Sequence, residues 1–255
     1  MKILYILPAP LGRTPAGAAD MARRGAKLRE FAAPGTQVDI CDVPRGPASI
    51  ESMFEEYVSI PATAERVLQA AADGYDAVII GCFGDPGVDA YRELTAMLVV
   101  GPAQVSFHAA ASLGQRFSVI TPLPSLVSGT RSLVEHYGLG SRLASVRAVN
   151  TAVLDLGKDR AATVEKVARE DRAALEQDGA DALVLGCMSL GFLDVAEEVS
   201  HIVGAPVINP PRFSLKATEA LVGAGLAHSK RAFMTPPKIQ TGQVRGASDL
   251  IVAYA

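Results

Sequence analysis

The sequence predicts an α/β protein built from two similar halves, each with a mostly parallel four-stranded sheet, related by pseudo-twofold symmetry and facing each other across a cleft. Apolar runs of strand length alternate with helical patterns, which is typical of parallel sheets. The segment DGYDAVIIGCFGDPG (73–87) resembles DGADALVLGCMSLGF (178–192), and ILYILPAP (3–10) resembles FSVITPLP (117–124). This internal repeat predicts a duplicated fold.

The strands are predicted from short apolar runs bounded by Gly, Pro or Asp. Four runs fall in each half, and the third run of each half ends immediately before Gly-Cys. The eight predicted strands are ILYIL (3–7), QVDIC (37–41), DAVII (76–80), MLVVG (97–101), FSVIT (117–121), ASVRAV (144–149), DALVL (181–185) and APVIN (205–209).

The helices between these strands have recognisable ends. Thr14 is a candidate N-cap before the helix that starts at Pro15, and a second helix over 59–74 ends on Asp-Gly. Asp85 is expected to cap a helix over 84–98, and a last helix over 212–227 is expected to pack back on the first half. Glu51, Glu55 and Glu56 are expected to form a solvated helix face.

Residues 1–101 with about 210–255 are assigned to the first half, and 102–209 to the second.

With 49% apolar and 20% charged residues and a net charge of −3, the chain is expected to be globular, with no basic surface for nucleic acid or an anionic membrane. No run is long enough to span a bilayer, and MKILYILP is too short for a signal peptide. A cytoplasmic location is therefore expected, where the three cysteines stay reduced.

Two of the three cysteines, Cys82 and Cys187, occupy matched places in the repeat, 105 residues apart. Each follows a predicted strand at its carboxyl end, where parallel sheets bind ligands. Two thiols facing one ligand from opposite sides could remove a proton from a carbon beside a carbonyl and return one to the other face, which inverts the stereocentre. A following helix is expected to lower each thiol pKa, with Ser189 a candidate N-cap after Cys187. Cys41 is expected to be a small buried hydrophobe.

Several segments resemble the hydantoin racemase branch of the aspartate/glutamate/hydantoin racemase superfamily. They are RGPASIES (45–52), GCFGDPGVDAYREL (81–94), RFSVITPLPSLV (116–127), YGLGSRLASVRAVNTAVLDL (137–156), GADALVLGCMSL (179–190) and SKRAFMTPP (229–237). The resemblance implies cofactor-independent racemisation at C5 of a 5-monosubstituted hydantoin, with Cys82 and Cys187 as the two acid/base residues and the active site in the cleft. It also implies a homo-oligomer that binds a small hydantoin-like ring.

The resemblance extends to residues that contact the substrate. Ser49 and Thr121 match positions that touch the ring, and N–H groups after each cysteine could hold ring oxygens, as donors do in oxyanion holes. The residues concerned are Phe83, Gly84, Met188 and Ser189, of which Phe83 and Met188 could instead shape the side-chain pocket. The family's Asn-Pro-Asn-Thr-like segment is absent, because Leu7 and Ala9 replace its asparagines. The loss of this polar anchor leaves the identity of the substrate open.

Other functions stay open at this point. An allantoin racemase, an amino-acid racemase, a maleate-type cis-trans isomerase with a covalent cysteine, and a non-catalytic ligand-binding relative all share the resemblance. Phe83-Gly84 and Met188-Ser189 are neutral, which favours a neutral ring as the substrate over a zwitterion. The motifs have no cluster of arginines nearby, which is evidence against a dianionic substrate. The four histidines lack metal-ligand spacing, so neither a metal nor a cofactor is expected.

Overall fold

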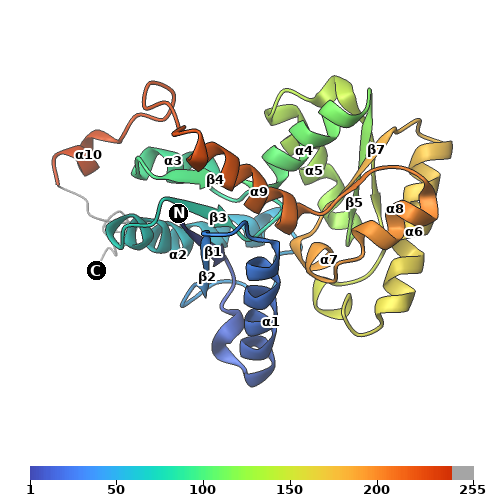
Figure 1. Cartoon of the computed structure of the whole chain (residues 1–255), viewed down its shortest axis with the longest axis horizontal. Coiled ribbons are helices and arrows are strands. Elements are labelled where there is room, and N and C mark those ends of the chain that lie inside the picture. The colour runs from blue at the N-terminus through green and yellow to red at the C-terminus, as the bar shows by residue number, and fades with distance from the viewer. Residues whose placement is uncertain (243–255) are drawn as a thin grey trace.

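The computed structural model describes residues 1–242, so the part of the first-half assignment that covers 243–255 lies outside the described residues. It contains two four-stranded parallel sheets with the same strand order, β2-β1-β3-β4 and β6-β5-β7-β8 (Figure 1). The predicted fold class is therefore confirmed. The strands are β1 (Lys2–Leu7), β2 (Gln37–Asp42), β3 (Ala77–Ile80), β4 (Leu98–Val100), β5 (Phe117–Thr121), β6 (Leu143–Ala148), β7 (Ala182–Leu185) and β8 (Val207–Ile208).

Helices connect the strands and cover both faces of each sheet (Figure 1). The α-helices are α1 (Pro15–Phe31), α2 (Met53–Ala72), α3 (Val88–Leu94), α4 (Pro102–Leu113), α5 (Val127–His136), α6 (Arg160–Glu176), α7 (Met188–Phe192), α8 (Ala196–Val203), α9 (Pro210–Gly223) and α10 (Pro237–Gln240). The described residues also form four 3-10 turns: η1 (Leu11–Arg13), η2 (Pro124–Leu126), η3 (Gly140–Arg142) and η4 (Val153–Asp155). Within residues 1–242, none of these helices combines the length and apolar character needed to cross a bilayer.

Alternation along the strands divides the apolar side chains between two layers. In β1, Ile3 and Tyr5 enter a core that also contains Phe117 and Val119 of β5, whereas Leu4 and Ile6 pack under α2. The inner faces of both sheets thus belong to one continuous core. Helices α1, α4 and α9 lie over this shared core, and α9 contacts both β3 and α7 (Figure 1).

Several helix ends differ from those predicted. Thr14 does cap α1, because its hydroxyl accepts the Gly17 N–H at 3.1 Å. The second helix begins at Met53 rather than near 59, with Ser52 as its N-cap and Pro61 inside it. The third covers only Val88–Leu94, since the chain turns back into the short strand β4.

Asp85 was predicted to cap the helix that follows it, and this prediction is wrong. The residue has a φ of +49°, and its buried carboxylate accepts the N–H groups of Ala103 and Gln104 at 3.0 and 2.9 Å, in the first turn of α4. The hydroxyl of Tyr137 donates to it as well, at 2.9 Å. Asp85 therefore fixes the loop after Cys82 to the helix that leads into the second sheet.

The chain after α9 runs back along the first sheet. The ring Nε2 of His228 contacts the backbone of Val99, and Lys230 donates to the carbonyls of Arg92 and Glu93. The contact of His228 is with the edge strand β4, and those of Lys230 are with the end of α3. The division of the chain into the two predicted halves, the homo-oligomer and the cytoplasmic location stay predictions.

Candidate active site

The two matched cysteines leave their sheets through the same backbone turn. The N–H of Gly81 donates to Ile6 O and that of Gly186 to Ile120 O, each at 2.7 Å. A Cβ on either glycine would lie within 3 Å of that same carbonyl oxygen. Only glycine permits this close approach. The next residue in each half is the cysteine, which is therefore held just beyond the carboxyl end of β3 or β7.

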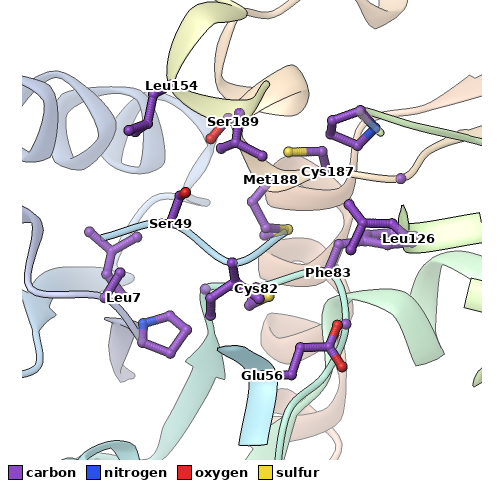
Figure 2. A pocket seen from close by; sticks show the side chains of 18 of the residues that line it. Leu7, Ser49, Glu56, Cys82, Phe83, Leu126, Leu154, Cys187, Met188 and Ser189 are labelled. Carbon is purple, nitrogen blue, oxygen red and sulfur yellow. The ribbon is translucent and has the colours of Figure 1, made fainter. Parts of the chain in front are cut away.

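Both thiols line one pocket of about 110 Å³ between the two sheets (Figure 2). Loops from both halves complete its wall, including residues 7–11, 48–50, 121–122 and 153–154. The structure brings all eight residues selected from the sequence to this pocket, although their roles stay predictions. They are Ser49, Cys82, Phe83, Gly84, Thr121, Cys187, Met188 and Ser189.

The polar side chains of the pocket differ in what they bind. The hydroxyl of Thr121 is fully buried and has no hydrogen-bond partner among the described residues. Ser49 is half-buried at the end of the loop that precedes α2, and no hydrogen bond fixes its hydroxyl within the part of the chain described. A buried hydroxyl without a partner is rare in proteins. Thr121 is thus the side chain best placed to accept or donate a hydrogen bond to a ligand.

Phe83 and Met188 are part of the floor of the pocket. Both are buried in the shared core, and the Phe83 ring packs edge-on against Phe107 with centroids 5.5 Å apart. Their side chains therefore set the depth of the pocket. Ser189 was predicted to cap the helix after Cys187. This prediction is wrong, because α7 begins at Met188 and Ser189 lies inside it.

The expectation that both thiol pKa values are lowered is wrong for the ligand-free protein. Burial raises the pKa of Cys82 well above its usual value, and the Glu56 carboxylate raises it further, while the N–H of Gly84 opposes this. Burial also raises the pKa of Cys187, but the N–H groups of Leu190 and Ser189 and the charge of Arg24 counteract it. Desolvation of the anion outweighs the backbone dipoles at both sites.

A model of the Asp/Glu/hydantoin racemase family matches residues 12–218. The chain belongs to this family. It is 38% identical to the hydantoin racemase of Pseudomonas sp. (strain NS671) over 80% of this chain and 81% of that protein. Identity to the hydantoin racemase of Paenarthrobacter aurescens is 34% over 90% and 94% of the two chains. Among solved structures, the allantoin racemase from Klebsiella pneumoniae has a TM-score of 0.85 and 32% identity, covering 93% of this chain and 94% of that one.

Sequence reasoning missed two charged residues of this racemase. Glu56 was expected on a solvated helix face but is half-buried in the pocket wall, because α2 starts at Met53, before the predicted start at 59, and places the Glu56 carboxylate against Gly84. Burial and the nearby Asp85 raise the pKa of Glu56 to about 7. Arg24 also lines the pocket, and its Nη2 donates to Ser189 Oγ at 3.0 Å. It lies in α1, far along the chain from both cysteine motifs, so no local pattern indicated it.

Glu51 also departs from the predicted solvated face. Its carboxylate accepts the N–H of Val153 at 2.7 Å, and its carbonyl accepts the hydroxyl of Ser125 at 2.8 Å. Both partners belong to the second half, so Glu51 ties the loop that carries Ser49 to the opposite wall of the racemase pocket. Only Glu55 behaves as a helix-end residue. Its carboxylate accepts the N–H of Glu51 and the hydroxyl of Ser52, and its own N–H donates to the Ser52 hydroxyl.

Proposed function

We propose that this racemase inverts C5 of 5-monosubstituted hydantoins by proton transfer between Cys82 and Cys187, without a cofactor. The observation that carries the proposal is the placement of two thiols at equivalent positions of two matching sheets, on one pocket. A planar ring held between them presents one face of C5 to each sulfur.

The chemistry requires one thiolate and one thiol at the moment of reaction. The thiolate removes the C5 proton, and the electron pair of the C–H bond moves into the ring as an enolate. The opposite thiol then gives its proton to the other face of C5, so that the configuration inverts and the two cysteines exchange protonation states. The hydroxyl of Thr121 is the group we assign to a ring carbonyl or ring N–H, since it has no other partner in the described structure. Ser49 is the second group assigned to the ring.

The lining of the pocket supports an apolar 5-substituent. Leu7 and Ala9, where the family's asparagines are absent, line the pocket together with Ile50, Leu126 and Leu154. Figure 2 shows Leu7, Leu126 and Leu154 around the two cysteines. These side chains offer no hydrogen-bond partner to a polar group. Alkyl and benzyl substituents fit this wall better than the ureido group of allantoin, whose N–H and C=O groups would lose their hydration without replacement.

Free amino acids and dicarboxylates fit less well. Arg24 is the one cation among the described residues that line the pocket, and it is already bound to Asp20 at 2.7 Å and to Ser189. A carboxylate substrate would have to compete with Asp20 for this one guanidinium. This arrangement favours a neutral ring over an amino acid or a maleate-type dianion.

The test follows the optical rotation of a single enantiomer of 5-benzylhydantoin in deuterated buffer near neutral pH. We expect loss of rotation together with deuterium at C5, and at least about a 100-fold loss of rate in Cys82→Ala and in Cys187→Ala, the range for removal of a general acid or base. Cys41→Ala is the matched control, because Cys41 lies in β2 away from the pocket and its activity should equal that of the wild type.

Two results would contradict the proposal. Racemisation at the wild-type rate in both pocket variants would make the thiols structural. A higher kcat/KM for allantoin than for 5-benzylhydantoin would overturn the assignment of an apolar substituent, for which we expect a preference of about tenfold or more, the equivalent of one or two unpaired hydrogen bonds.

A further inference from the structure

The wall around Cys82 carries a negative charge. A Cβ placed on Gly84 would lie 2.0 Å from the Glu56 carboxylate, which shows that this carboxylate lies directly against the residue two positions after Cys82. No hydrogen bond or ion pair among the described residues neutralises Glu56. Asp85 adds a second carboxyl nearby, although the N–H groups of α4 hold it. Figure 2 shows the Glu56 oxygens and the Cys82 sulfur on the same side of the pocket.

The wall around Cys187 carries a positive charge. Arg24 reaches across from α1 to Ser189, two positions after Cys187, and its guanidinium lies 5.1 Å from the ring centroid of Phe192. The side chain of Arg24 is only 11% exposed. Its partner Asp20 also binds Arg23 at 2.6 Å, so two arginines share one carboxylate and the group keeps a net positive charge.

We infer that Glu56 and Arg24 polarise the pair, so that in the ligand-free racemase Cys187 loses its proton at a lower pH than Cys82 does. Equivalent positions, two residues after each cysteine, meet a carboxylate in one half and a guanidinium in the other. An otherwise symmetric pair of thiols is thereby made unequal. The inference rests on the proposed function for its catalytic meaning, but the protonation states themselves exist without a substrate.

The other titratable groups near the thiols do not cancel this difference. Tyr5 lies close enough to both cysteines to interact with their charges, and Tyr91 interacts with Cys82. Burial raises the pKa of each tyrosine far above neutral, so both are uncharged. Glu56, with a pKa raised to about 7, is ionised over the range in which a buried thiol loses its proton.

The polarity has a catalytic consequence. The form of the enzyme in which only Cys187 is ionised accepts the enantiomer whose C5–H faces Cys187, and after inversion the proton carried by Cys187 must return to Cys82 through solvent before the next such turnover. Enantiomers have an equilibrium constant of unity, so kcat/KM must be equal in the two directions. The inequality of the thiols then appears as a kcat that differs between the two enantiomers and a KM that differs by the same factor.

The inference is tested by the rate at which iodoacetamide alkylates each cysteine of the ligand-free protein, measured by peptide mass spectrometry from about pH 6 to about pH 10. The pH midpoint of each rate profile reports ionisation of that thiol in the coupled pair and is independent of how accessible the sulfur is. We expect a lower midpoint for Cys187 than for Cys82. Glu56→Gln should raise the rate at Cys82 about tenfold at a pH below its midpoint, and Arg24→Met should lower the rate at Cys187 similarly.

Neighbouring residues supply matched controls. Glu55→Gln removes the same charge one position away and keeps an acceptor for the N–H of Glu51 and the hydroxyl of Ser52. Arg29→Met removes a positive charge from an exposed position of α1 that does not line the pocket. Both should leave the midpoints of the two thiols unchanged, and Arg24→Lys should restore that of Cys187. A midpoint of Cys82 at or below that of Cys187, or no change at Cys82 in Glu56→Gln, would overturn the inference. Either result would stand whether or not the protein racemises hydantoins, which the rotation assay decides separately.

Discussion

Replacing Thr121 by Val should make the racemase more stable and less active. The hydroxyl of Thr121 is fully buried without a partner in the described structure, and such a group destabilises a fold by about 1–3 kcal/mol. Val keeps the branched shape at the end of β5 and removes the unpaired group. We expect the free energy of unfolding to rise by about 1 kcal/mol, which corresponds to a Tm higher by about 2–4 °C in a chain of this size. If the hydroxyl binds the ring, kcat/KM should fall about three- to tenfold, the value of one neutral hydrogen bond.

The measurement is urea unfolding at fixed pH together with the rotation assay. Thr163→Val is the matched control: its hydroxyl is also buried, but it donates to the Leu156 carbonyl at 2.8 Å, so the same substitution should lower stability by about 1 kcal/mol. Equal destabilisation by both substitutions would mean that Thr121 has a partner within the protein. Stabilisation with unchanged activity would show that its hydroxyl does not contact the substrate.

Further predictions concern packing, pH and the pocket loops. Gly191→Ala should destabilise by at least about 2 kcal/mol in urea unfolding, since its Cβ would lie 2.2 Å from a Pro211 ring carbon, whereas Gly223→Ala meets nothing within 4 Å and should be neutral or slightly stabilising. Burial alone would raise the pKa of Glu219, but hydrogen bonds from a backbone N–H and a lysine outweigh it and hold that pKa below its usual value. Its contribution to stability is therefore present above the usual glutamate pKa of about 4.3 and is lost as pH falls through the lower folded value, so Glu219→Gln should flatten that part of the urea-midpoint profile. Glu51→Ala should raise KM several-fold with a smaller change in kcat, measured by initial rates, because it removes the side-chain acceptor that holds the Val153 N–H and so loosens the loop over 153–154 in the pocket wall.

The fold was predictable because its two strongest signals are local. Runs such as DAVII and DALVL have strand length, strand composition and a following Gly-Cys, and their repetition identified the duplication. The ends of α2 and α3 were not predictable from the same rules. Pro61 was predicted near the start of α2, yet it lies well inside that helix. The helix predicted over 84–98 overlapped the strand predicted over 97–101, and the structure ends the helix at Leu94 and keeps the strand, which pairs with β3.

The site could be predicted as far as it lies within the two cysteine motifs. Thr121 and Ser49 were reached by resemblance, while Arg24 was missed because its partner Ser189 is 165 residues away along the chain. Glu56 was misread since a helix face that looks polar in sequence cannot reveal which of its carboxylates meets a cavity. The raised thiol pKa values depend on desolvation, which only the packed structure shows.

The single core beneath both sheets limits how the molecule can open. Inter-domain motion is expected where an interface is small and polar, but here the inner faces of the two sheets interlock through large aromatic and aliphatic side chains. Separation of the two sheets would expose this shared hydrophobic core to water. We therefore expect small molecules to enter and leave this pocket by rearrangement of its surface loops, with little change in the distance between the two sheets.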